Sequence, residues 1–212
     1  MQNQPAQFAS PQSIANLAAS QNYTLIETPE LVESVCREIL TCYPFPVLGL
    51  DCEGLIKGKP IALLQLSYHE HSYVFDLTRV NPFDHRLSFN LKKILTSFNI
   101  VKIFHDFCED CSALINQHGV YCNSVFDTQI AHRVISTATQ NLGNGSNENQ
   151  IGLNTLLQKY LGAEVQNDYK KTISKQMKMD DSFWHTLRPL SEQMLEYAAQ
   201  DVIFLPRVYE QM

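Results

Sequence analysis

The sequence predicts an α/β domain built on a mixed central β-sheet that is flanked by α-helices. Three short apolar runs, each bounded by turn residues, follow one another between residues 47 and 77, and such a succession is typical of an antiparallel meander. Amphipathic segments with one further apolar run among them occupy the rest of the chain, which favours the α/β class. With 212 residues, 44% of them hydrophobic and 18% charged, the chain can form one globular domain with a substantial core.

The first element that the sequence predicts is a helix that follows a flexible leader. Residues 1–22 are rich in Gln, Asn, Ala, Ser and Pro and show no period, so we expect a leader there and a domain over residues 23–212. Thr28 offers a capping hydroxyl, and Pro29 suits the first helical position. The apolar positions that follow predict a helix through Ile39.

Predicted strands and helices then alternate along the chain. The expected strands are residues 47–51, 61–68, 72–77 and 100–104. The expected helices are residues 90–98, 110–117, 128–135 and 153–161. A last helix should start after Ser191, which can cap it, and should kink or end at Pro206. Residues 137–150 contain a polar, glycine-bearing stretch that we expect to be a mobile loop.

The charge balance and the cysteines limit the classes of protein to which this chain can belong. The formal net charge is −6, which excludes a basic nucleic-acid coat, because non-specific binding depends on Lys and Arg that neutralise phosphates. Within residues 164–182 lie four lysines, which either guide a phosphate backbone or belong to a solvated segment. The six cysteines are too sparse for a disulfide scaffold. No apolar stretch approaches the roughly 20 residues of a membrane-spanning helix, and the N-terminus does not have the pattern of a signal peptide. We therefore expect an intracellular protein, nuclear or cytoplasmic, with no membrane partner.

Acidic residues gather in three blocks along the chain. Asp51 and Glu53, at and just after the end of a predicted strand, are two residues apart. In extended backbone this spacing directs both carboxylates to the same face. The second block, residues 105–110, carries three more acids. Tyr197 and Asp201 are four residues apart on the last helix, which stacks them one turn apart. Because carboxylate oxygens suit hard divalent cations such as Mg²⁺ and Mn²⁺, the blocks together predict a two-metal nuclease site.

With their flanking residues, these blocks resemble the DEDD superfamily of 3′–5′ exonucleases, which share a ribonuclease-H-like fold. The Tyr197-x-x-x-Asp201 spacing is similar to that of the DEDDy subgroup, which includes ribonuclease D and the Werner-type exonuclease domain. Residues 184–202 resemble the ribonuclease D pattern around its third motif. The residues at 105–106 and 126–129 resemble the Egalitarian-like branch, also called the exonuclease-domain-containing-1 type. Some members of that branch have lost catalytic carboxylates and serve as RNA-binding adaptors.

The resemblance implies a two-metal-ion mechanism with Mg²⁺ or Mn²⁺ that hydrolyses the terminal phosphodiester of single-stranded nucleic acid and releases nucleoside monophosphates from the 3′ end. It implies that Asp51 bridges the two cations. Glu53 and Asp201 would complete the cation on the nucleophile side, and Asp110 would hold the other. Tyr197 would orient the attacking water, because an ordinary tyrosine pKa of about 10 makes it a poor base.

Three interpretations of the function remain open. The first is a 3′–5′ exonuclease that acts on RNA. The second is a catalytically silent adaptor on the same fold, which binds RNA or protein, and an extra acid in the second block, Asp106, favours it. The third is a DNA-directed exonuclease of Werner type. Because ribonuclease D carries a nucleic-acid-binding domain downstream, a protein partner is expected to supply substrate affinity here.

Four further residues are expected to have structural roles. His105 is predicted to be a hydrogen-bonded residue rather than a metal ligand. Asp127 should cap the helix that follows it. Trp184 and Arg188 are expected to serve in packing and in a salt bridge.

Overall fold

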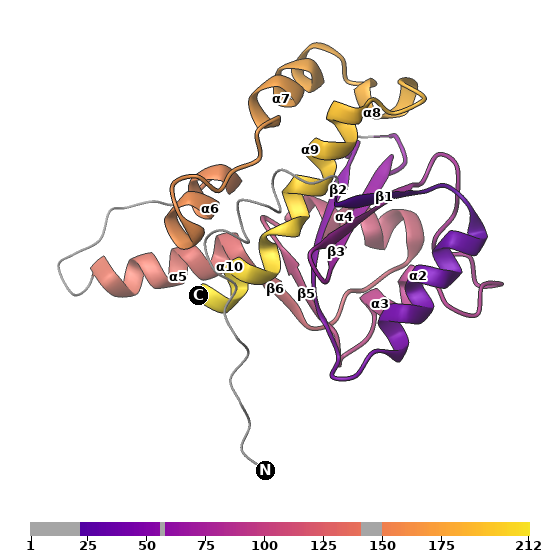
Figure 1. The fold of residues 1–212 in the computed structure, drawn as a ribbon, viewed down its shortest axis with the longest axis horizontal. Helices are drawn as coiled ribbons and strands as arrows, with labels where there is room; N and C mark the ends of the chain where they lie inside the picture. Colours follow the sequence, from indigo (N-terminus) through magenta and orange to yellow (C-terminus); the bar gives the residue numbers. More distant parts are fainter. Residues whose placement is uncertain (1–21, 56–57, 141–149) are drawn as a thin grey trace.

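The computed structural model describes residues 22–55, 58–140 and 150–212, which form a mixed β-sheet with helices on both faces (Figure 1). Among these residues the sheet has six strands in the order β1-β4-β3-β2-β5-β6. The strands are β1 (Tyr23–Ile26), β2 (Val47–Glu53), β3 (Leu63–Tyr68), β4 (His71–Asp76), β5 (Val101–Phe104) and β6 (Val125–Asp127). The predicted meander is present, because β2, β3 and β4 are antiparallel neighbours, while β1, β5 and β6 join in parallel. The predicted α/β class with a mixed sheet is confirmed.

The helices begin and end largely where the capping signals predict. They are α2 (Pro29–Thr41), α3 (Leu91–Leu95), α4 (Cys108–His118), α5 (Thr128–Gln140), α6 (Leu153–Leu161), α7 (Lys170–Met179), α8 (Phe183–Thr186), α9 (Glu192–Ile203) and α10 (Leu205–Gln211). The hydroxyl of Thr28 accepts a hydrogen bond from the Leu31 N–H at 3.4 Å, and that of Ser191 accepts one from the Met194 N–H at 3.3 Å. Helix α9 ends before Pro206, as predicted. Within the described residues, no helix has the length and apolar character needed to cross a bilayer.

Several expectations about local structure were wrong or incomplete. Helix α3 is shorter than the expected 90–98, since Asn90 is its N-cap and Thr96 is its C-cap. Helix α5 continues through Gln140, so the predicted loop begins later, and its residues 141–149 lie outside the described part of the chain, as does nearly all of the predicted leader. The polar segment 164–182 contains a helix, α7, whose Ile173 is 1% exposed and belongs to the same hydrophobic cluster as Tyr197 and Ala198 of α9. Strands β1 and β6 were not predicted, since so short a strand depends on the neighbour with which it pairs.

Alternation along β2 separates the two faces of the sheet. Leu48, Leu50 and Cys52 belong to the core beneath α2, α3 and α4. The residues between them point to the opposite face, which α9 covers, because successive side chains of a strand alternate. Asp51 and Glu53 therefore share the face toward α9, as the spacing of two predicts.

Helix α9, yellow in Figure 1, crosses the sheet in close contact with β2 at Gly49. A Cβ atom at Gly49 would lie 2.3 Å from the carbonyl oxygen of Val202, so only glycine permits this approach. Two buried hydroxyls fasten the helix to the neighbouring strands. Ser67 Oγ donates to the Val202 carbonyl at 2.8 Å, and Ser72 Oγ donates to the Ala199 carbonyl at 3.0 Å. These contacts fix the position of α9 above the acidic end of β2.

Candidate active site

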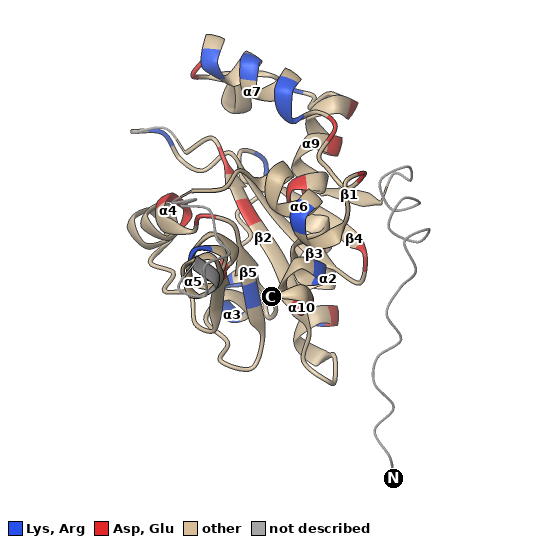
Figure 2. Ribbon diagram, turned by 90° about the vertical axis from the view of Figure 1, so that its left-hand side faces the viewer, with Lys and Arg blue, Asp and Glu red and all other residues tan. Residues whose placement is uncertain are grey.

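Three carboxylates from two elements meet on the α9 face of the sheet. Asp51 and Glu53 come from β2, Asp201 comes from α9, and one oxygen of each lies within 4.8 Å of the others. Glu53 is 6% exposed and Asp201 is 3% exposed, so their charges are largely shielded from water. Figure 2 shows the acidic residues on β2 and the lysine-bearing α7 on the same side of the molecule. Two of the three predicted acidic blocks thus meet directly.

Asp110, from the second block, approaches the same group from α4. It is 5% exposed, and its charge acts on Asp51. Burial raises the pKa of Asp110 to about 7, although a hydrogen bond with Cys52 opposes the shift. Within the described residues its Oδ1 atom has no hydrogen-bond partner. Asp110 therefore flanks the group of three without belonging to it.

Tyr197 lies one turn before Asp201 on α9 and is 2% exposed. Its hydroxyl is within hydrogen-bonding reach of Glu53, and its ring lies 5.8 Å from that of Trp184 between centroids. Burial raises the pKa of Tyr197, and the charges of Asp201 and Glu53 raise it further. The phenol therefore keeps its proton, which suits it to orient a bound group and not to act as a base.

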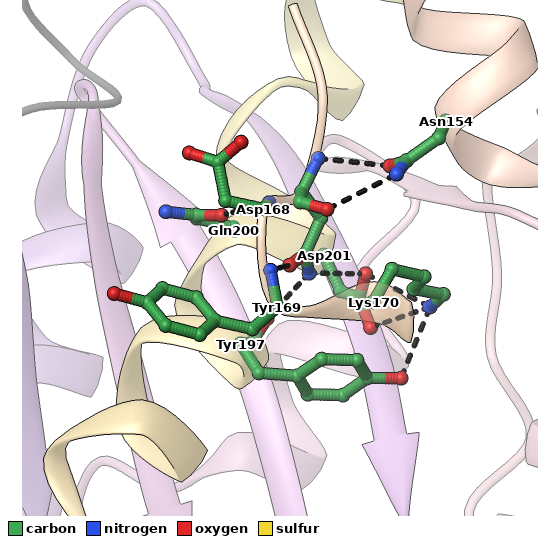
Figure 3. A network of polar contacts seen from close by, with 8 residues as sticks. Asn154, Asp168, Tyr169, Lys170, Tyr197, Gln200 and Asp201 are labelled. Atoms are coloured by element: carbon green, nitrogen blue, oxygen red, sulfur yellow. Dashed lines mark hydrogen bonds and ion pairs between the residues drawn. The ribbon is translucent and has the colours of Figure 1, made fainter. Parts of the chain in front are cut away.

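Two residues that the sequence did not assign to this site also contact Asp201. Lys170, the first residue of α7 and one of the four lysines of residues 164–182, donates to the two carboxylate oxygens of Asp201 at 2.9 and 2.8 Å and to the Tyr197 hydroxyl at 3.0 Å (Figure 3). The amide of Asn167 donates to Asp201 Oδ1 at 2.9 Å and to the Tyr197 carbonyl at 2.9 Å. The side-chain amide of Asn154, on α6, holds the backbone of Asn167. It donates to the Asn167 carbonyl at 3.0 Å and accepts a hydrogen bond from the Asn167 N–H at 2.8 Å. No spacing or motif in the polar segment indicates these contacts, since both depend on how α7 and α9 meet.

Among the described residues, four carboxyl groups and the ammonium group of Lys170 interact at this site. Burial raises the pKa of Asp51 well above its ordinary value, and the charges of Asp110, Glu53 and Asp201 raise it further. Burial and then Asp201 raise the pKa of Glu53 to about 8. Burial disfavours the ammonium form of Lys170, but the surrounding carboxylates outweigh this effect and raise its pKa. One cation thus compensates only part of the repulsion among four carboxyl groups.

The donor set fits Mg²⁺ or Mn²⁺. All the ligand atoms are carboxylate oxygens, which these hard cations prefer. The buried Asp110 Oδ1 and the side-chain amide of Gln65, which is paired opposite Asp51 in the sheet, have no hydrogen-bond partner within the described part of the chain. Such unpaired buried atoms are costly unless a cation or its water shell satisfies them.

His105 and Asp127 have the structural roles that were predicted. His105 Nδ1 pairs with Thr128 Oγ1 at 2.9 Å, and its Nε2 pairs with the Ile151 carbonyl at 3.0 Å. Asp127 Oδ1 accepts a hydrogen bond from the Gln129 N–H at 2.8 Å at the start of α5. Both predictions are confirmed.

Asp106, the extra acid, lies apart from the carboxylate group. It is exposed, and its Oδ2 atom is 3.5 Å from Gln150 Nε2. Its backbone N–H donates to Asp127 Oδ1 at 3.1 Å, which holds it in the turn before α4. Its contacts therefore connect it with the start of α5 and not with Asp51, Glu53 or Asp201.

Comparison with known proteins is consistent with this geometry. A family model described as 3′–5′ exonuclease matches residues 23–212. Exosome complex component 10 of Mus musculus is 29% identical over an alignment of 224 residues, which covers 97% of this chain and 21% of that protein. Ribonuclease D of Xanthomonas oryzae pv. oryzae is 29% identical over 173 residues, which cover 78% of this chain and 39% of that protein. The crystal structure of Trypanosoma brucei RNase D in complex with RNA U12 matches with a TM-score of 0.75 and 21% identity, over 95% of this chain and 66% of that one.

A mixed sheet with buried carboxylates on a central strand and on the helix that crosses it defines a ribonuclease-H-like domain of the nuclease type. The chain belongs to the 3′–5′ exonuclease family, in its DEDDy-type ribonuclease D group. The predicted fold and family are confirmed, while the placement in the Egalitarian-like branch stays a prediction. The chain spans less than half the length of the two relatives described above.

The raised pKa values predict that the protein without bound metal loses stability as the pH rises. A carboxyl group whose pKa is higher in the folded than in the unfolded state binds its proton more tightly when folded. The stabilisation of the folded state that results is fully present below the unfolded-state pKa of about 4. This stabilisation is lost as the pH rises through the folded-state pKa, which is about 7 for Asp110 and about 8 for Glu53. In EDTA, the midpoint temperature of thermal unfolding should therefore decrease as the pH is raised from about 5 to about 8.5.

Glu53→Gln is the matched variant for this measurement, because the amide keeps the shape of the side chain but cannot titrate. Its thermal midpoint, followed by calorimetry across the same pH range, should fall less steeply than that of the wild type. Added Mn²⁺ should flatten the wild-type curve, since a bound cation favours ionised carboxylates. Parallel curves for the two proteins would mean that other groups cause the fall.

Proposed function

We propose that this chain is a metal-dependent 3′–5′ exonuclease that shortens single-stranded RNA from its 3′ end and releases nucleoside monophosphates. The observation that carries the proposal is the group of Asp51, Glu53 and Asp201, whose oxygens lie within 4.8 Å of one another in a largely buried site. Asp110 and Tyr197 adjoin it. Burying so many carboxylates without full compensation costs stability, which is typical of a site built for function.

Asp51, Glu53, Asp110 and Asp201 would hold two divalent cations, which supply charge neutralisation for the phosphodiester and a lower pKa for the attacking water. Asp51 would serve both cation positions. In support of this role, it groups with Glu53 and Asp201 and also interacts electrostatically with Asp110. Asp110 lies apart from the group of three and would serve the second position, through water if necessary, since magnesium keeps several waters.

The remaining residues position the reacting groups. The protonated hydroxyl of Tyr197 donates a hydrogen bond and would orient the attacking water beside Glu53. Asn167 fixes one oxygen of Asp201 and so sets the direction of the other. Hydrolysis joins the oxygen of water to the terminal phosphorus and breaks its bond to the 3′ oxygen of the preceding nucleotide. The shortened strand keeps a 3′ hydroxyl, and the cycle can repeat.

The choice of RNA follows the relatives, among them an exosome component and an RNase D crystallised with RNA U12. A DNA substrate of the Werner type remains the alternative. With a net charge of −6, the chain has little general attraction for phosphates, which favours a protein partner that supplies substrate affinity. An intracellular location, nuclear or cytoplasmic, accords with this role.

One observation favours the second candidate, a silent adaptor. Lys170 pairs with Asp201 at 2.8 Å, so the site has a cation of its own in the absence of metal. The full set of acidic residues favours the enzyme, because an adaptor would gain stability by losing them.

Cleavage of 5′-labelled single-stranded RNA and DNA in Mg²⁺, in Mn²⁺ and in EDTA tests the proposal. We expect a ladder that shortens from the 3′ end of RNA in either metal and disappears in EDTA. Circular RNA of the same sequence is the control, since an exonuclease cannot start without an end. RNA binding without cleavage in any metal would favour the adaptor, and faster cleavage of DNA would favour the Werner-type substrate.

A further inference from the structure

The ammonium group of Lys170 is bound to both Asp201 and Tyr197. Its ammonium nitrogen lies 2.9 and 2.8 Å from the two carboxylate oxygens of Asp201 and 3.0 Å from the hydroxyl of Tyr197. It also stands 4.8 Å from the centroid of the Tyr197 ring. With hydrogen bonds to both oxygens of one carboxylate and to a phenol, the ammonium group of Lys170 is held in the site and is not a freely solvated lysine.

The ammonium group uses the same oxygens that a divalent cation would need. Each carboxylate oxygen has two lone-pair directions. Asn167 and Lys170 take both directions on Oδ1 of Asp201, and Lys170 takes one on Oδ2. A magnesium ion binds oxygen at about 2.1 Å, which would bring it close to the ammonium nitrogen, and two like charges in a buried site repel strongly.

The side chain also has a route out of the site. The side chain of Lys170 is 34% exposed, whereas the side chain of Asp201 is 2% exposed. A lysine stem is long and flexible, so its ammonium group can swing into solvent without a change in the backbone. Asn167 can stay bound to Asp201 meanwhile, because it occupies one lone-pair direction only.

We propose that Lys170 is the resident counter-ion of the metal-free site, which holds the cation position between Asp201 and Tyr197 and leaves it when a divalent cation binds. Lys170 is thus a positioning residue that acts through Asp201 and sets the metal affinity of the site. The inference rests on the proposed function, because it takes these carboxylates as the cation ligands.

Direct binding of Mn²⁺, measured by calorimetry without nucleic acid, tests the inference on the full chain. A charge within about 4–6 Å changes the proton affinity of a carboxylate by about 10- to 1000-fold, and we expect a similar competition with the metal. Lys170→Met should therefore bind Mn²⁺ at least about tenfold more tightly than the wild type. Lys171→Met is the matched control, since it removes the same charge from an exposed position on the same helix, and it should bind as the wild type does.

A second measurement uses the wild type alone and applies even if Lys170→Met does not fold. Acetic anhydride acetylates free amines, and mass spectrometry gives the rate at each lysine. Addition of Mn²⁺ should accelerate acetylation of Lys170 and leave that of Lys171 unchanged. A purely structural lysine would show no such release.

The outcomes separate the inference from the proposed function. If the wild type binds Mn²⁺, but Lys170→Met binds it no more tightly or the acetylation rate of Lys170 does not change, the inference is overturned and the exonuclease proposal stands. If neither the wild type nor Lys170→Met binds Mn²⁺, the metal site itself is wrong and both proposals fail.

Discussion

Asp51→Asn is expected to lower the rate of RNA cleavage by about a thousandfold or more, equivalent to about 4 kcal/mol of transition-state stabilisation. Asp51 is the carboxylate on which the charges of Glu53, Asp110 and Asp201 all act. The amide keeps the shape of the side chain but offers one oxygen and no charge, so it cannot serve two cations. Single-turnover cleavage of 5′-labelled RNA at saturating Mn²⁺ measures the effect.

The loss of activity should not come from unfolding. Replacing a carboxyl group at a site with excess negative charge removes repulsion, so the thermal midpoint of Asp51→Asn in EDTA should equal or exceed that of the wild type. Glu27→Gln, at an exposed position far from the site in the sequence, removes the same charge and should cleave at the wild-type rate. Wild-type cleavage by Asp51→Asn would refute its assignment as a metal ligand.

Arg188→Met is expected to cost about 3–5 kcal/mol of folding stability, as breaking a buried ion pair usually does. The guanidinium group of Arg188 donates to both oxygens of Asp76 at 2.6 and 2.9 Å. Asp76 is fully buried, and the Arg188 side chain is 12% exposed. Removing the arginine leaves a buried carboxylate without its main partner. It also frees the carbonyl of Trp184, which Arg188 holds at 2.9 Å in the segment that leads into α9.

Urea unfolding, followed by the fluorescence of the single tryptophan, measures this loss. Arg86→Met is the matched control, because Arg86 also contacts both oxygens of an aspartate, Asp84, but is 81% exposed, so no measurable change is expected. The double variant Asp76→Asn with Arg188→Met should recover part of the lost stability. Equal losses for Arg188→Met and Arg86→Met would contradict the view that burial makes the first pair important. The prediction that Arg188 and Trp184 serve in salt-bridge formation and packing is already confirmed by their contacts.

Elements that carry a strong local signal were predicted well. Helix α2 starts at its capping threonine, α6 ends at Gly162, and the meander from β2 to β4 follows its apolar runs. Each of these depends on a period or a cap within a few residues of the chain. The strands β1 and β6 were missed because each becomes a strand only through a partner that lies far away in the sequence.

Only some of the residues that meet at the candidate site could be predicted from local spacing. Asp51, Glu53 and Asp201 were found because their spacings match the strand and the helix that carry them. Lys170 and Asn167 were not assigned to the site, since they reach Asp201 from 31 and 34 residues away across a segment with no recognisable pattern. Asp110 adjoins the group in the structure, and its role as a metal ligand stays a prediction.

The sequence by itself determined which side chains share a face, because the alternation of a strand and the turn of a helix are properties of the local backbone. Only the tertiary structure decided which faces meet. Helix α9 can place Asp201 against Asp51 because Gly49 lets it approach β2, and α7 then brings Lys170 to the same carboxylate. Burial of apolar surface drives the packing of helices on the sheet, but this driving force is non-directional. Which helix packs against which strand therefore depends on the shape of the whole close-packed core and not on any one segment.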